Sequence, residues 1–144
     1  MAKPTTLPFS EFLILIGDGA SPEVFAAPCG LTSKGLDISA SSNGIEVPDC
    51  DDPDAPAWTG RVVKALSGSI SGAGILATES FTLWNEWCLS GLPKNCRVKF
   101  DHTGMGYYSG SFILNKCGFK ASLGDKVQVD IGLESDGQII WTNS

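Results

Sequence analysis

Five cysteines and one histidine are the residues of this chain best suited to nucleophilic or metal chemistry. They are Cys29, Cys50, Cys88, Cys96, Cys117 and His102. A closed zinc site needs four ligands, usually in closely spaced pairs, and the sequence holds no Cys-x-x-Cys pair. We therefore expect no metal site and no cofactor. The cysteines should be reduced and serve mostly as small buried hydrophobic side chains.

The motifs of common enzyme classes are missing. A serine or cysteine hydrolase needs a base beside its nucleophile, and His102, in a Gly-rich turn, is the only histidine. The segment Gly68–Gly72 has isoleucine where a nucleophile elbow has serine. No Gly-Lys-Ser/Thr sequence of a phosphate-binding loop is present, and the neighbouring carboxylates Asp51 and Asp52 carry no sign of burial. The sequence therefore predicts a protein that is not an enzyme; an enzymatic role would require an activity that is lost in His102→Ala.

An acidic, proline-rich loop runs from Val47 to Trp58. Three prolines and four aspartates fall within residues 48–56. Proline excludes a central strand or a helix interior, and the EF-hand spacing of calcium ligands is absent. The loop is either a solvated connection or a functional contact, because long loops in small domains are usually functional or disordered.

Composition predicts one globular domain over residues 1–144, with an N-terminal arm at about 1–10. Hydrophobic residues make up 42% of the chain and charged residues 18%, as in ordinary folded domains. The longest apolar run, Phe12–Ile16, is too short to span a membrane, and no signal peptide is expected, so we expect synthesis in a bacterial-type cytoplasm. The net charge of −6 argues against a protein that grips nucleic acid.

Most of the elements predicted to position these residues are β-strands. Alternation of apolar and polar residues or short apolar runs predict strands at 12–16, 25–29, 36–41, 62–75, 97–100, 107–119, 127–133 and 138–141. Asn43-Gly44 is expected to end the third of these with a turn. One helix is predicted over 79–89. The predicted fold is mainly β, an antiparallel sandwich or barrel with one α-helix.

The helix prediction depends on its ends and on one apolar stripe. Thr78 is expected to cap the start, and Gly91 should end the helix. Phe81, Trp84 and Cys88 share one side and should pack on the core.

Each of the two long strands is predicted to have one apolar face and one face of small or acidic side chains. Leu36, Ile38, Leu66 and Ile70 are expected to face the core of the subunit. The opposite faces carry small or acidic side chains: Asp37, Ser39, Ser41, Ser67, Ser69 and Ser71. Small side chains suit a surface close to another molecule, and long strands leave edges that an oligomer can pair. Closing such strands into a ring removes those edges.

In this order of elements the chain resembles the major tail tube proteins of long-tailed phages and gene transfer agents, from about Phe9 to Thr142. The resemblance rests on an ordered set of segments: 12–18, 35–39, the loop at 47–58, 66–72, 89–93, 97–100 and 108–113.

The resemblance implies a structural virion protein that forms homohexameric rings stacked into a hollow conduit for DNA. Its strands would join a continuous inner β-barrel, with the small and acidic faces near the lumen. Four strands from each of six subunits, spaced by about 4.8 Å and tilted near 45°, would give a barrel roughly 50 Å across. DNA would pass without specific binding. The expected partners are other copies of the chain and the tape measure, tail terminator and distal tail proteins, with no membrane contact. The expected location is the virion tail, assembled in the host cytoplasm.

The same resemblance favours a contact between successive rings at the 47–58 loop. Four aspartates, Asp49, Asp51, Asp52 and Asp54, would supply charge for register, and Trp58 would be an apolar anchor. Other tube-like ring proteins remain open: a tail terminator, a contractile-tail inner tube or a secretion-system tube. A monomeric ligand-binding β-barrel is the alternative from another class.

Overall fold

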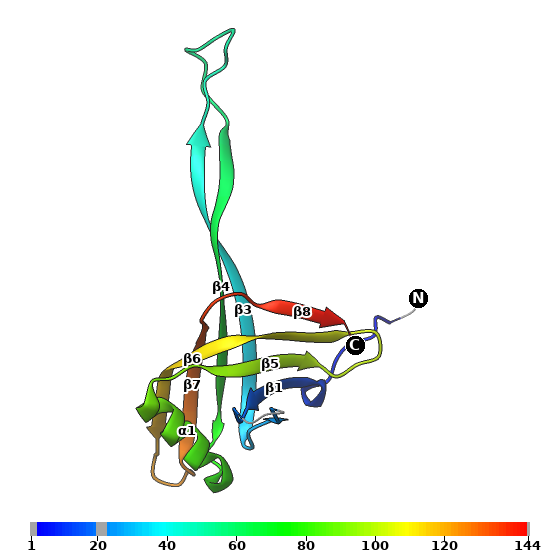
Figure 1. Cartoon of the computed structure of the whole chain (residues 1–144), viewed down its shortest axis with the longest axis vertical. Helices are drawn as coiled ribbons and strands as arrows, with labels where there is room; N and C mark the ends of the chain where they lie inside the picture. Colours follow the sequence, from blue (N-terminus) through cyan, green and yellow to red (C-terminus); the bar gives the residue numbers. More distant parts are fainter. Residues whose placement is uncertain (1–2, 20–22, 144) are drawn as a thin grey trace. The chain divides into compact units, whose positions relative to one another are not determined.

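The computed structural model of the chain describes residues 3–19 and 23–143. Its elements, in chain order, are a short 3-10 helix η1 (Phe9–Glu11), β1 (Phe12–Gly17), β2 (Phe25–Ala26), β3 (Leu31–Glu46), β4 (Thr59–Ile75), α1 (Thr78–Ser90), β5 (Lys94–Phe100), β6 (Gly106–Lys120), β7 (Gln128–Ser135) and β8 (Ile140–Asn143). Figure 1 shows this order along the chain. The mainly β character and the single helix predicted from the sequence are confirmed.

The strands form one sheet in the order β2-β1-β5-β6-β7-β4-β3, and β8 pairs with the first part of β6. The β1–β2, β1–β5, β5–β6, β6–β7, β6–β8 and β4–β7 pairs are antiparallel. In β6 the register shifts between Leu114 and Lys116. Within one chain the sheet does not close, because β2 and β3 lie at its two ends. The predicted antiparallel sheet is present, but as an open sheet.

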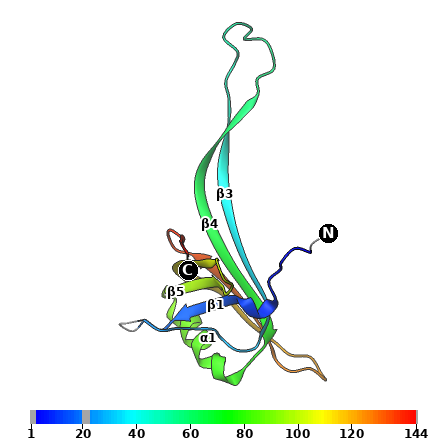
Figure 2. The same cartoon turned by 90° about the vertical axis from the view of Figure 1, so that its right-hand side faces the viewer.

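The chain divides into two compact units, which we call the sheet unit (residues 1–37 and 68–144) and the hairpin unit (residues 38–67). The strands β3 and β4 each contribute to both. The sheet unit holds all of the other strands and α1. The hairpin unit consists of the remaining parts of β3 and β4 and the loop between them, which Figure 2 shows as a two-stranded ribbon.

The hydrophobic core lies in the sheet unit and follows the predicted alternation. In β7, Val129, Ile131 and Leu133 are buried while Asp130 and Glu134 are exposed. The same alternation places further core residues on the neighbouring strands: Ile14, Ile16, Ile70, Cys96, Val98 and Phe112. Burial of each large apolar side chain stabilises the fold by about 1.5–3 kcal/mol.

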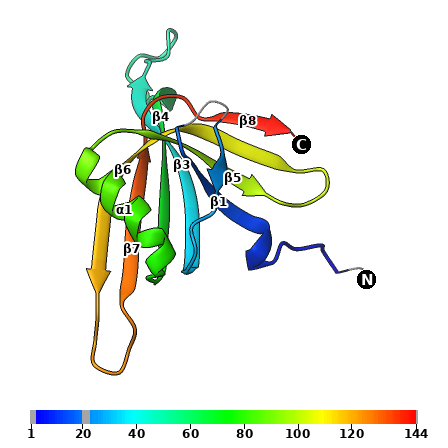
Figure 3. The same ribbon diagram turned by 60° about the horizontal axis from the view of Figure 1, so that its bottom comes forward.

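The helix α1 closes this core from one side. Trp84 and Trp87 are each 1% exposed, and their rings stack with centroids 6.3 Å apart. The indole Nε1–H of Trp87 donates a hydrogen bond to the carbonyl of Leu92, at 2.8 Å, so the polar atom of a buried ring has a partner. Figure 3 shows α1 beside β6 and β7. No helix in the described part of the chain is long and apolar enough to cross a bilayer.

Two details of the helix prediction are wrong. Thr78 is the first helical residue, and the N-cap is Ala77, which makes no side-chain capping bond. The stripe is shifted, since Phe81 and Cys88 are exposed at the side of the helix while Trp87 joins Trp84 in the core. The predicted end is confirmed: Gly91 adopts a left-handed conformation with φ of 67°, which favours glycine.

The turn predicted at Asn43-Gly44 is also wrong, because β3 continues through it to Glu46. The reason lies in the partner strand, since β4 begins as early as Thr59, which lies beside Gly44. The connection between the strands is therefore residues 47–58, the predicted loop.

Candidate assembly surfaces

The outer edge of β3 is the longest unpaired strand edge in the described part of the chain. β3 has 16 residues and ends the sheet, whereas the strand at the other end, β2, has two. An unpaired edge presents N–H and C=O groups that can pair with a strand of another chain. The open sheet is therefore suited to extension by a neighbouring subunit.

In the sheet unit, Ser69 and Ser71 lie on the face opposite the core. Both are exposed, while Ile70 between them is 1% exposed. Across the β4–β7 pair, Ser69 lies opposite Glu134 and Ala73 lies opposite Asp130. Asp37 on β3 is exposed as well. This face therefore combines small side chains with carboxylates.

The β7 carboxylates are members of this face that the site prediction missed. The same alternation that identified the core of β7 places Asp130 and Glu134 on its other side, so the signal was available. Lys116 of β6 forms an ion pair with Asp130, with the Nζ 2.8 Å from the carboxylate. Both groups are more than half exposed, so the pair adds little stability.

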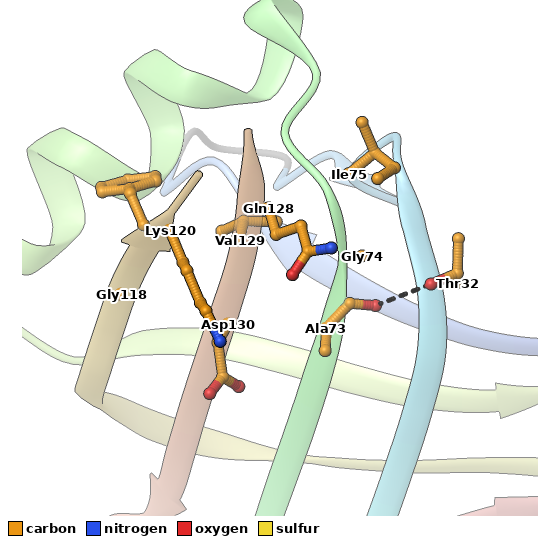
Figure 4. A pocket seen from close by; sticks show the side chains of 10 residues that line it. Thr32, Ala73, Gly74, Ile75, Gly118, Lys120, Gln128, Val129 and Asp130 are labelled. Atoms are coloured by element: carbon orange, nitrogen blue, oxygen red, sulfur yellow. Dashed lines mark hydrogen bonds between the residues drawn. The ribbon is translucent and has the colours of Figure 1, made fainter. Parts of the chain in front are cut away.

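A shallow hollow of about 500 Å³ lies on this face. Thr32, Ala73, Lys120, Gln128 and Asp130 contribute to its lining, as Figure 4 shows. The hydroxyl of Thr32 donates a hydrogen bond to the carbonyl of Ala73, at 3.4 Å. No histidine or cysteine lines the hollow. It is a shallow hollow of the sheet surface with both polar and apolar side chains in its lining.

In the hairpin unit, one face also carries small polar side chains. The hydroxyls of Ser39 and Ser67 lie 3.1 Å apart in a hydrogen bond between β3 and β4. Ser41 is exposed two residues further along β3 and shares the face of Ser39, since alternate residues of a strand point to the same side. The structure thus brings Ser39 and Ser67 together.

The other face of the hairpin carries large apolar side chains that are exposed in the single chain, and we call it the apolar face after Ile38 and Leu66. Ile38 is 49% exposed and Leu66 is 72% exposed. The prediction that these two residues face the subunit core is therefore wrong, whereas Ile70 is buried and Leu36 packs against the core as predicted. Alternation assigns side chains to a face, but it does not say whether the same chain covers that face. Exposed apolar side chains gathered on one element are typical of a contact surface.

The loop 47–58 connects the two strands of the hairpin. The backbone N–H of Asp51 donates a hydrogen bond to the carboxylate of Asp49, at 2.9 Å, and the N–H of Ala55 donates to the carbonyl of Asp52, at 3.1 Å. These bonds form local turns. Asp49, Asp51, Asp52 and Asp54 are all exposed, and Trp58 is 95% exposed.

The titratable residues do not form a reactive cluster in the described part of the chain. No group of three or more His, Cys, Asp or Glu side chains there lies close enough to hold a metal ion. His102 Nδ1 lies 3.3 Å from the carboxylate of Glu11. The expectation of mostly buried cysteines is wrong, since Cys29, Cys50 and Cys88 are exposed and Cys117 is half-buried. Cys96 is buried, and burial raises the pKa of its thiol to about 12.

Comparison with known proteins gives three results. A sequence profile described as phage tail tube protein matches residues 6–140. A sequence search of functionally described proteins finds no significant match. Several solved structures share the fold.

The chain is similar to a chain in the tail of an empty gene transfer agent particle, with a TM-score of 0.79 and 16% identity over 95% of this chain and 99% of that one. A chain of the native gene transfer agent virion gives a TM-score of 0.78 with the same identity and coverage. The tail tube of phage SPP1 gives a TM-score of 0.66 and 10% identity, over 96% of this chain and 80% of that one. At these identities the likeness concerns the fold.

Proposed function

Because the chain belongs to the phage tail tube protein family, we propose that it is the major tail tube subunit of a long-tailed phage or gene transfer agent. In this proposal six copies form a ring, and stacked rings form the conduit through which DNA is delivered. The tube subunit is a structural protein, and we assign it no catalytic role.

The open sheet with its unpaired β3 edge is the observation that best supports a ring. β6, β7, β4 and β3 are consecutive neighbours in the sheet and include its three longest strands. Six copies of these four strands, spaced by about 4.8 Å and tilted near 45°, make a barrel roughly 50 Å across. Duplex DNA passes through a barrel of this size. Closing the ring would satisfy the edge that a single chain leaves open.

We place the face with small and acidic side chains near the lumen. Its members are Asp37, Ser39, Ser41, Ser67, Ser69 and Ser71, and Asp130 and Glu134 extend it on β7. A basic lining would hold DNA by neutralising phosphates, whereas small and acidic groups let DNA pass without specific binding. The position of Ser39 and Ser69 in an assembled tube tests this assignment, and an outer-wall position would contradict it.

The apolar face of the hairpin and the 47–58 loop supply the proposed contacts between subunits. Ile38 and Leu66 would pack on a neighbouring subunit, because nothing in their own unit covers them. The loop would contact the next ring, with its aspartates setting register and Trp58 anchoring the contact. Its prolines reduce the entropy lost when the loop docks.

We propose that residues 1–144 act as one tail tube domain with an N-terminal arm at about 1–10. Further partners would be the tape measure, tail terminator and distal tail proteins. The site of function would be the virion tail, after assembly in the host cytoplasm.

Negative-stain microscopy of the purified chain, together with light scattering, tests the proposal. Rings with sixfold symmetry or long tubes of uniform diameter are the expected result. A monodisperse 15.2 kDa monomer at all concentrations would contradict it and favour a monomeric ligand-binding barrel.

A tube of a contractile system is the second candidate. The chain shares its fold with a chain of the sheath–tube complex of an extracellular contractile injection system, with a TM-score of 0.63 and 17% identity. Images of complete particles distinguish the two candidates, since a sheath around the tube would favour this one.

A further inference from the structure

Two cysteines from different elements of the sheet unit meet where α1 crosses β6. The rings of Phe81 on α1 and Phe119 on β6 have centroids 5.8 Å apart, which fixes one point of contact between the helix and the strand. Cys88 follows Phe81 by seven residues, or about two helical turns, and therefore lies on the same side of α1. Cys117 precedes Phe119 by two residues, on the same face of β6.

This geometry brings Cys88 and Cys117 near one another at the crossing, close enough for Cys88 to act on the pKa of Cys117. Burial raises the pKa of Cys117, and the neighbouring Cys88 raises it further through its charge and through a side-chain hydrogen bond. Cys117 is half-buried and packs against the hydrophobic core, whereas Cys88 is exposed. Both cysteines are free.

We propose that Cys88 and Cys117 are a dithiol that closes to a disulfide between α1 and β6 when the chain meets a small-molecule disulfide, such as oxidised glutathione. The closure of the disulfide goes beyond the function of a tube subunit, and only its timing rests on the proposed function. The exposed and half-buried thiols have different roles in the reaction.

The exposed thiol reacts first. Cys88 loses its proton to solvent, and its thiolate attacks one sulfur of the small disulfide. The S–S bond of the reagent breaks, a mixed disulfide forms on Cys88, and one reduced thiol leaves. Cys117, deprotonated in its turn, then attacks the Cys88 sulfur and displaces the second thiol. The chain is oxidised by two electrons, and the reagent is reduced to two thiols.

The timing of this step rests on the proposed location of the protein. Thiols in the cytosol are kept reduced, and disulfides persist outside it. A subunit assembled in the host cytoplasm would carry the open dithiol. A released particle would meet oxidants and could close it.

Treatment of the reduced full-length chain with oxidised glutathione, followed by intact mass measurement and peptide mapping, tests the proposal. The wild type should lose two hydrogens, keep no glutathione at this site and yield a peptide that links Cys88 to Cys117. Cys117→Ser should instead accumulate one glutathione on Cys88, because the resolving thiol is gone. Cys88→Ser should form no link to Cys117, and its half-buried thiol should react slowly. Cys50→Ser, which removes an exposed cysteine in the hairpin unit, is the matched control and should close the disulfide like the wild type.

Thermal unfolding adds a second measurement. The crosslink closes a loop of about 30 residues, so oxidation should raise the Tm of the wild type by roughly 5–10 °C, reversibly with a dithiol reductant. Stable glutathione on Cys88 of the wild type, or a disulfide that joins other cysteines, would overturn the proposal. A failure of the chain to form tubes would leave it intact, because the disulfide forms within one chain.

Discussion

Gly74 occupies a point of the sheet unit where two backbones approach closely. A Cβ atom at this position would meet the carbonyl oxygen of Gly30 and the backbone of Leu31 and Thr32. Backbone atoms cannot move aside as the end of a flexible side chain can. The glycine is therefore needed for the close pairing of β4 with the start of β3.

We predict that Gly74→Ala lowers the free energy of unfolding by about 1–3 kcal/mol. Gly35→Ala is the matched control, because its Cβ would meet only the hydroxyl of Ser71, at 3.1 Å. Alanine also restricts the unfolded chain, so the control should be close to neutral. Chemical denaturation of both variants at one low protein concentration measures the difference. Equal losses in the two variants would contradict the steric argument.

Cys96 makes stability depend on pH at the alkaline end. Its thiol is buried and donates a hydrogen bond to the carbonyl of Lys94, at 3.7 Å. Burial raises the pKa of this thiol from an ordinary value of 9.0 to about 12 in the folded chain. Between these values the unfolded chain has lost the proton and the folded chain keeps it, so the free energy of unfolding falls as pH rises.

We predict that the free energy of unfolding of the wild type falls by up to about 4 kcal/mol relative to that of Cys96→Ala as pH rises from 9 to 12. The difference between the two proteins removes the contribution of lysines and tyrosines that titrate in the same range. The same burial should protect Cys96 from iodoacetamide at neutral pH, while exposed Cys29 reacts. A pH-independent difference between the two proteins would refute this.

At the scale of single elements, substitutions of two tryptophans distinguish an effect on folding from an effect on assembly. Trp84 is 1% exposed in α1, and Trp58 is 95% exposed at the end of the loop. Trp84→Ala should cost about 3–5 kcal/mol of stability. Trp58→Ala should leave subunit stability within about 0.5 kcal/mol and shorten the tubes, because Trp58 is proposed to anchor one ring on the next. Calorimetry and electron microscopy measure the two effects. If Trp58→Ala forms tubes of full length, Trp58 is not part of the contact between rings.

Deletion of residues 49–56 tests the loop as a whole. The deleted segment lies between the strands of the hairpin and is almost entirely exposed, so a short Gly-Ser connection should let the two strands still pair. We expect rings that form but do not stack. If tubes of normal length assemble, the loop is only a solvated connection.

The elements of this chain could be predicted because most of their determinants are local. Alternation in β7 identified Val129, Ile131 and Leu133 as core, and Gly91 identified the end of α1. The error at Asn43-Gly44 has a long-range cause. This pair favours a turn in isolation, but its pairing with β4, distant in the sequence, continues the strand through it. Ile38 and Leu66 were assigned to the correct face of their strands, yet alternation could not say that this face remains uncovered.

At the scale of the whole molecule, the uncovered face of the hairpin should govern association. Leu66→Gln replaces an exposed apolar side chain that we propose is buried between subunits. The lost burial of about 1.5–3 kcal/mol per contact should weaken association roughly 10- to 100-fold. Ser41→Gln, on the opposite face, is the matched control and should assemble normally. Light scattering across a concentration series measures both. Unchanged assembly of Leu66→Gln would exclude this face from the contact.

The two-stranded ribbon of residues 38–67 has a consequence for the thermodynamics of the free subunit. A hairpin with only two strands is at best marginally stable in water, and this one keeps its apolar side chains in solvent. If assembly supplies the missing cover, part of the folding free energy is released only on association, and it follows the law of mass action. The hairpin unit would then exchange its amide hydrogens quickly in dilute solution and slowly in the polymer, whereas the amides of β7 would be protected in both. Folding of the ribbon and growth of the tube would be a single concentration-dependent equilibrium.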